Sequence, residues 1–251
     1  MQQGMNESLY LDWSFWAVIV AALALLLSQF PPIHELVRRA RLTLESHSRI
    51  HLTHKIGNPN VQLHVILTNV GGRSVRVKEI AVNLRRDGRD IATLSAQGYL
   101  QESSDKNAVL FTGFRLKSKE EWAHIVNFFS YLSRTDEKRY RAAELALRTD
   151  IVEKTKLPEN KDRLVEADPK YLPALDQLFD EKFIWLPGEY ELDILVRTSD
   201  RKAGTHQKYR FTLFESDSTD LSKVKADFKY GDGVYWDSGN HTGVIVQIVE
   251  A

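Results

Sequence analysis

The feature that most constrains this chain is a long uncharged stretch near its N-terminus. No residue from Trp13 to Ile33 carries a charge, and residues 17–27 are only alanine, valine, isoleucine and leucine. A helix of that length rises about 32 Å, which matches the hydrocarbon thickness of a bilayer. Aromatic side chains of the kind found at membrane interfaces lie at its start: Tyr10, Trp13, Phe15 and Trp16. The stretch predicts a transmembrane helix over residues 13–32, after a short extracytoplasmic tail over residues 1–12.

Two alternatives fit this stretch less well. A cleaved signal peptide normally begins with lysine or arginine, and neither precedes Trp13. A buried core helix is usually shorter. Small side chains spaced about four residues apart would let such helices pack closely. The residues expected to span the membrane include Trp13, Trp16, Ala17, Ala21, Ala24 and Phe30.

The charges on either side of the stretch predict its orientation. Acidic residues precede it, whereas Arg38, Arg39 and Arg41 follow it. Because basic residues stay on the cytoplasmic side, we expect an outside N-terminus and a cytoplasmic domain at a bacterial inner membrane. Residues 33–48 are predicted to form a juxtamembrane amphipathic basic helix, with the three arginines near the lipid headgroups.

Composition excludes several kinds of chemistry. The 34 Lys and Arg residues balance the 34 Asp and Glu residues, so no global field attracts nucleic acid. There is no cysteine, which excludes thiol catalysis, cysteine-ligated zinc and iron–sulfur clusters. The absence of disulfides also favours a reducing compartment.

Alternating apolar residues predict β-strands over residues 49–116 and 183–251. Val61, Leu63, Val65 and Leu67 would share one strand face. Residues 69–74 and 87–88 have turn compositions. The alternation changes phase near residues 78–79, which predicts a β-bulge. The alternating segments 190–196 and 209–213, joined by a polar turn at residues 200–205, would pair as antiparallel strands. Residues 244–249 would form a last strand, paired either within the chain or with a neighbouring subunit.

These strands resemble a known class of domain. The run from Leu67 to Val82 resembles the paired strands of immunoglobulin-like bacterial sandwich domains, and Pro187-Gly188-Glu189-Tyr190 is similar to their tyrosine-corner strand. The resemblance implies a cytoplasmic immunoglobulin-like antiparallel β-sandwich on a single-pass transmembrane helix.

Residues 117–182 are predicted to form a helical insertion in this sandwich. Ser118-Lys119-Glu120-Glu121 has the pattern of a capping box, and apolar residues follow at helical spacing. A second helix is expected from Thr135 to about Arg148, and a third from residue 169 to about Glu181. The first helix is a candidate surface for assembly between subunits. Its aromatic side chains, on the helix or just after it, are Trp122, Phe128, Phe129 and Tyr131.

The sequence contains no catalytic signature that we could identify. Phosphate-binding loops, nucleophile elbows and zinc-protease helices are absent. His47, His51 and His54 would gather on a helix, but on a strand His51 and His54 point to opposite faces, so we expect no metal and no cofactor. A candidate patch for an anionic ligand, such as a nucleotide or oligonucleotide, comprises Arg134, Lys138, Arg139, Tyr140 and Arg141.

The layout resembles that of membrane effectors of bacterial antiphage defence. The resemblance implies a non-enzymatic sensor whose cytoplasmic domain binds a ligand or partner, assembles a homo-oligomer and acts at the membrane as a pore or channel. The alternative is a passive tethered scaffold that binds a partner protein from the same operon. An enzyme with an unrecognised site is a third hypothesis.

Overall fold

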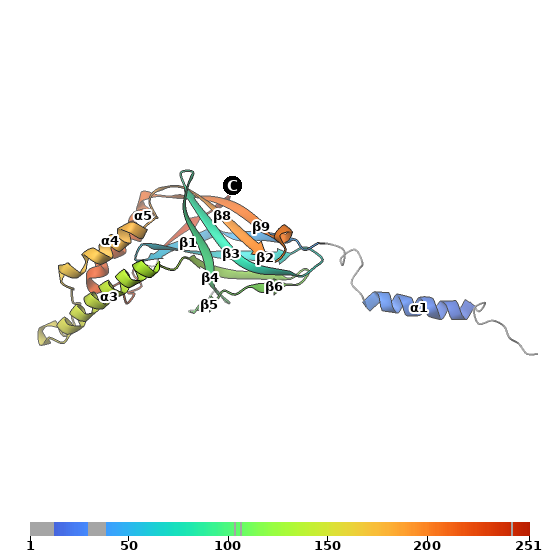
Figure 1. Ribbon diagram of the computed structural model, residues 1–251, viewed down its shortest axis with the longest axis horizontal. Helices are drawn as coiled ribbons and strands as arrows, with labels where there is room; N and C mark the ends of the chain where they lie inside the picture. Colours follow the sequence, from blue (N-terminus) through green and yellow to red (C-terminus); the bar gives the residue numbers. More distant parts are fainter. Residues whose placement is uncertain (1–12, 30–38, 103, 106, 242) are drawn as a thin grey trace, which may run out of the picture.

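Most of the chain folds into one curved antiparallel sheet with helices at one end, as shown by a computed structural model (Figure 1). The structure describes residues 13–29, 39–102, 104–105, 107–241 and 243–251. The helices are α1 (Trp13–Gln29), α3 (Arg134–Thr155), α4 (Pro173–Lys182) and α5 (Glu215–Ser222), with 3-10 helices η2 (Pro158–Asn160), η3 (Pro169–Tyr171), η4 (Arg201–Ala203) and η5 (Lys223–Tyr230). The strands are β1 (Leu42–Lys55), β2 (Asn58–Asn69), β3 (Val75–Arg86), β4 (Arg89–Leu100), β5 (Val109–Leu110), β6 (Phe114–Leu116), β7 (Glu121–Phe129), β8 (Gly188–Thr198), β9 (Thr205–Leu213), β10 (Val244–Gln247) and β11 (Val249–Glu250).

The sheet closes on itself through the last residues of the chain. Its order is β10-β1-β2-β7-β4-β3-β8-β9-β11, with β5 beside β4 and β6 beside β3. β10 pairs with β1 and β11 pairs with β9, and only Ile248 separates these two short strands. The Ile248 amide donates to the Ser48 carbonyl at 2.8 Å. One segment therefore satisfies backbone groups on both β1 and β9, so the last strand predicted over 244–249 pairs within the chain.

Alternating side chains from these strands fill the space inside the curved sheet. On β2, Val61, Leu63, Val65 and Leu67 are all buried, as the alternation predicts. The pairing of β3 with β8 shifts between Val77 and Glu79, which confirms the bulge. Positive φ angles at Asp87 and Gly88 form the predicted hairpin turn. The antiparallel pairing of β8 with β9 is also confirmed.

A second, smaller core lies at the end of the sheet that carries α3 and α4. There Ile56, at the tip of the β1–β2 hairpin, is buried together with side chains of α3, α4 and η5. These side chains include Leu147, Leu178, Phe179 and Phe228. The helix expected from Thr135 to about Arg148 is present as α3, and the third expected helix is present as η3 and α4.

The predicted immunoglobulin-like sandwich is wrong, because the strands form one nearly closed sheet. Local alternation identifies a half-buried strand but does not specify its neighbours, which are set by contacts distant in sequence. The local tyrosine-corner feature is nevertheless present. Tyr190 donates its hydroxyl to the Leu186 carbonyl at 2.7 Å.

The first predicted insertion helix is also wrong, because its residues form β7 at the centre of the sheet. β7 pairs with β2 on one side and β4 on the other. Apolar residues occur on both of its faces, so Trp122, Ile125 and Phe129 match helical spacing by coincidence. The presumed capping box is a turn instead, in which Lys119 has a φ of 63° and Glu120 accepts from the Lys117 amide. The helical region begins only at α3.

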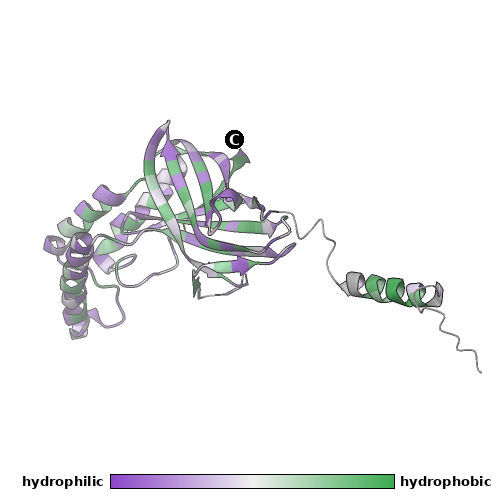
Figure 2. Cartoon of the chain, turned by 45° about the vertical axis from the view of Figure 1, so that its right-hand side comes forward, coloured by the Kyte–Doolittle hydropathy of each residue, from purple (hydrophilic) through white to green (hydrophobic). Residues whose placement is uncertain are grey.

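The predictions of a transmembrane helix and an inner-membrane location are wrong as well. Within the described residues, no helix combines the length and the apolar character needed to cross a membrane. α1 is strongly apolar (Figure 2), but its 17 residues rise only about 26 Å. Residues 42–48, expected in an amphipathic helix, belong to β1, where Leu42 and Leu44 are buried against β2. The predicted tail over residues 1–12 and the predictions for residues 30–38, including Phe30 and Arg38, lie outside the described residues.

The closing segment yields a stability prediction. Ile248→Ala should lower the free energy of unfolding by about 2–5 kcal/mol, because Ile248 is 3 % exposed and its truncation leaves a cavity where the two edges meet. Val249→Ala is the matched control, since Val249 is 56 % exposed on the same segment and should change stability by no more than about 0.5 kcal/mol. Urea unfolding followed by circular dichroism measures both, and equal effects would contradict the role of Ile248 in closure.

Candidate ligand pocket at the C-terminal loop

A pocket of about 280 Å³ lies between the end of the β1–β2 hairpin and the C-terminal loop, whose described residues are 231–241 and 243. The hairpin contributes Thr53, His54 and Lys55, and η5 with the preceding helix α5 contributes one wall. The remaining lining, which mixes aromatic rings with charged groups, comes from the loop: Gly233, Tyr235, Trp236, Asp237, His241 and Gly243. Segments about 180 residues apart in sequence thus build the site together.

The tip of the hairpin has a strained backbone that burial stabilises. Ile56 has a φ of 49° and Gly57 a φ of 76°, as a two-residue hairpin turn requires. A β-branched residue seldom adopts a positive φ, but the Ile56 side chain is only 2 % exposed and packs in the second core. A Cβ on Gly57 would lie 2.5 Å from the Phe179 carbonyl oxygen, so only glycine fits there.

His54 is held as a neutral ring in the pocket wall. Its Nε2 donates to the Leu221 carbonyl at 2.7 Å, and its Nδ1 accepts from the Gly57 amide at 3.2 Å. The rings of Phe179 and Phe183 lie edge-on to it. Burial, which disfavours the charged imidazole, lowers the pKa of His54 below its ordinary value. Both ring nitrogens are therefore committed to positioning the hairpin.

Two side-chain donors hold the C-terminal loop through one carbonyl group. Lys55 Nζ and the Tyr140 hydroxyl each donate to the Val234 carbonyl oxygen at 2.7 Å. Burial lowers the pKa of Lys55 and raises the pKa of Tyr140 to about 12. The loop is thereby fixed to β1 and to α3.

Three metal-ligating side chains converge beside the pocket. Asp227 from η5, Asp232 from the loop and His241 from the end of the loop place one ligand atom each within 4.8 Å of the others. His241 Nε2 lies 2.8 Å from Asp227 Oδ2 and 3.8 Å from Asp232 Oδ2. Asp232 is 3 % exposed and accepts from the amide and the hydroxyl of Ser238.

The loop depends on glycine to reach this shape. Gly231, Gly233, Gly239 and Gly243 all have φ between 70° and 85°, the left-handed region that favours glycine. A Cβ on Gly231 would lie 2.2 Å from the Tyr235 ring. That ring also receives the Arg148 guanidinium, 5.4 Å from its centroid.

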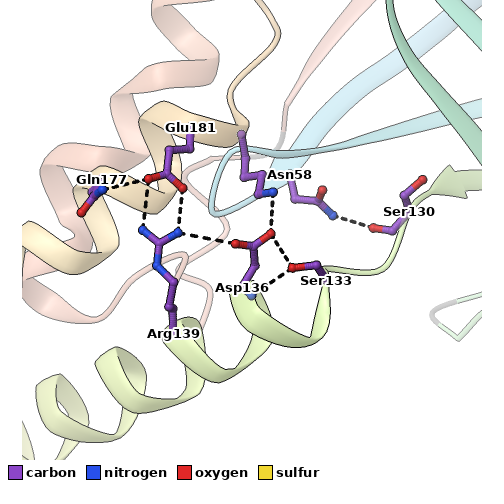
Figure 3. Close-up of polar contacts among 8 residues, drawn as sticks. Asn58, Ser130, Ser133, Asp136, Arg139, Gln177 and Glu181 are labelled. Carbon is purple, nitrogen blue, oxygen red and sulfur yellow. Dashed lines mark hydrogen bonds and ion pairs between the residues drawn. The ribbon is translucent and has the colours of Figure 1, made fainter.

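The candidate patch for an anionic ligand lies on α3, where carboxylates already neutralise its two best-placed arginines. Figure 3 shows the contacts of Arg139. Arg139 makes two hydrogen bonds to Glu181 of α4, at 2.7 and 3.1 Å, and Arg141 contacts Glu137 at 2.8 Å. Asp136 accepts from Ser133 and pairs with Lys182. The Tyr140 ring is buried, whereas Arg134 and Lys138 are exposed. Arg139 therefore joins α3 to α4, Arg141 pairs with carboxylates of α3 itself, and their role in ligand binding stays a prediction.

The other predicted site residues are dispersed. Trp122 stacks on Phe114 at 4.7 Å, Phe128 is fully buried, Phe129 is half-buried, and Tyr131 is 71 % exposed. Arg39 and Arg41 are exposed beside a groove that also includes Lys202. Trp13, Trp16, Ala17, Ala21 and Ala24 are exposed on α1. Of His47, His51 and His54, which were considered as metal ligands, only His54 lines the pocket. His51 contacts Gln62.

Sequence reasoning missed the pocket residues of the C-terminal loop. The available signal is the spacing of glycine and aspartate over residues 231–239, which favours a loop of tight turns. No known protein family matches this chain, and no curated protein matches it either.

The lowered pKa of His54 predicts a pH dependence of stability. As pH falls through the ordinary value of 6.5, the unfolded chain takes up a proton that folded His54 does not, so stability falls until the folded pKa is reached. The contribution of His54 is fully present above about pH 7. His54→Gln should therefore reduce the loss of stability between pH 7.5 and 5.5.

Urea midpoints at the two pH values measure this difference. An unchanged pH dependence in His54→Gln would contradict the assignment.

Proposed function

We propose that this chain is a non-enzymatic binding protein that assembles into a homo-oligomer through α1 and recognises its ligand in the pocket at the C-terminal loop. The observation that carries the proposal is the uncovered apolar surface of α1. Binding is favoured over catalysis because His54 and Lys55 of the pocket form hydrogen bonds that hold the backbone.

α1 exposes more apolar surface than a monomer normally leaves in contact with water. Trp13, Val18, Val20, Leu23 and Leu25 are between 52 and 89 % exposed. Burying one such side chain contributes about 1.5–3 kcal/mol. The helix carries no charge and is apolar around its circumference. A matching surface must itself be apolar and free of charge, and a second copy of α1 supplies it.

The pocket supports binding because the histidine and the lysine of its hairpin wall have structural duties. His54 uses both ring nitrogens to hold the backbone, and Lys55 donates to the Val234 carbonyl that also fixes Tyr140. A general base needs a free nitrogen or oxygen within reach of the proton it removes. What remains available is a lining of aromatic rings and carboxylates, which suits recognition of a small polar molecule.

Assembly through α1 is tested by adding charge to its apolar surface. The double change Leu23→Glu and Leu25→Glu should convert an oligomer into a monomer of about 28.8 kDa, because a packed helix interface would then contain unpaired carboxylates. Sedimentation velocity on the purified full chain at micromolar concentration measures the mass.

The matched control is Leu145→Glu with Val152→Glu on α3. Both residues are exposed apolar side chains, at 66 and 45 %, so the chemical change is the same at a site outside α1. This variant should keep the mass of the unmodified chain. A monomeric unmodified chain, or an α1 variant that keeps the oligomeric mass, would overturn the proposal.

A further inference from the structure

We infer that Asp227, Asp232 and His241 bind a divalent transition-metal cation, with Zn²⁺ as the best match to the donor set. This site goes beyond the assembly and ligand recognition proposed above, and it stands whether or not α1 associates. The argument rests on the convergence of the three side chains, on the charge of the cluster and on the chemistry of its donors.

The ligand atoms come from three consecutive pieces of backbone. Asp227 is in η5, Asp232 follows the left-handed Gly231, and His241 precedes the left-handed Gly243. All three ligand atoms lie within 4.8 Å of one another, and His241 Nε2 already lies 2.8 Å from Asp227. Small side-chain rotations therefore suffice for one ion to replace the proton shared by these two groups.

The cluster carries negative charge that protein cations do not neutralise. Asp232 is 3 % exposed, and its hydrogen-bond donors from Ser238 are neutral. In the ion pairs of the described part of the chain, Asp227 and Asp232 meet His241 and neither meets a lysine or an arginine. A buried carboxylate is normally paired with a cation or coordinates a metal. This uncompensated buried charge is independent of the convergence itself.

The donor set selects the class of ion. Ca²⁺ and Mg²⁺ prefer all-oxygen ligands, whereas an imidazole nitrogen suits zinc and its first-row neighbours. Two carboxylates and one histidine are known zinc ligand types, and three protein ligands leave a fourth position open. Because His241 also lines the pocket, the ion would lie at the border of the candidate ligand site.

Zinc titration of the metal-free full chain tests the inference. After treatment with EDTA and dialysis, isothermal titration calorimetry at pH 7.5 should show one high-affinity Zn²⁺ per chain and much weaker binding of Mg²⁺ and Ca²⁺. Co²⁺ should give the visible absorbance of a low-coordination site. No uptake of Zn²⁺ would overturn the inference and leave the cluster as a histidine in contact with two carboxylates.

Variants separate this site from chance binding elsewhere. His241→Gln and Asp227→Asn should each weaken Zn²⁺ binding at least tenfold, because each removes a ligand. Asp237→Asn changes a carboxylate of the same loop outside the cluster, so its affinity should stay within about threefold. Asp232→Asn changes a buried group, so circular dichroism must show that this variant folds. His241→Gln and Asp227→Asn, at partly exposed positions, decide whether the cluster binds Zn²⁺. Undiminished binding by His241→Gln would assign the zinc to surface histidines such as His47 and overturn the inference.

Discussion

The structure depends on one backbone segment that serves two sheet edges. β1 and β9 would otherwise end the sheet with unpaired amide and carbonyl groups, which natural proteins cover because open edges recruit other chains. Residues 244–250 pair first with β1 and then with β9. Val246 and Ile248 point into the core, while Ile245 and Val249 face outward. The closure thus combines hydrogen bonding with apolar burial, and it holds β1 and β9 beside each other.

The strands could be predicted from sequence because their signal is local. In β2, β8 and β9 one face is buried, so apolar residues alternate with polar ones and even the bulge in β3 leaves a visible change of phase. β7 escaped recognition because a central strand with apolar groups on both faces loses that alternation. The sandwich was wrong for a different reason. The pairing of β2 with β7 joins residues 53 to 69 positions apart, and that of β1 with β10 joins residues 192 to 198 positions apart. No periodicity encodes those choices.

The candidate site was harder to predict than the fold. Charge density along the chain selected Arg139 and Arg141, but α4 supplies Glu181 to Arg139 from 42 residues away. The pocket instead unites the hairpin tip with a loop near the C-terminus, and neither segment is unusual in charge. The glycines of that loop were the available signal. A series of left-handed turns costs conformational entropy, and such a loop persists only where specific contacts hold it in place.

Those contacts link the site to the closure. The Val234 carbonyl accepts from Lys55 on β1 and from Tyr140 on α3, which fixes the beginning of the loop. His241 and Asp232 draw its end toward η5, and β10 starts three residues after His241. Whatever binds the folded loop and not the unfolded chain stabilises the loop by mass action. Because β10 continues directly from it, the same free energy favours the paired position of the closing segment. A ligand held by the loop would therefore also stabilise the closed sheet, through about ten residues of backbone.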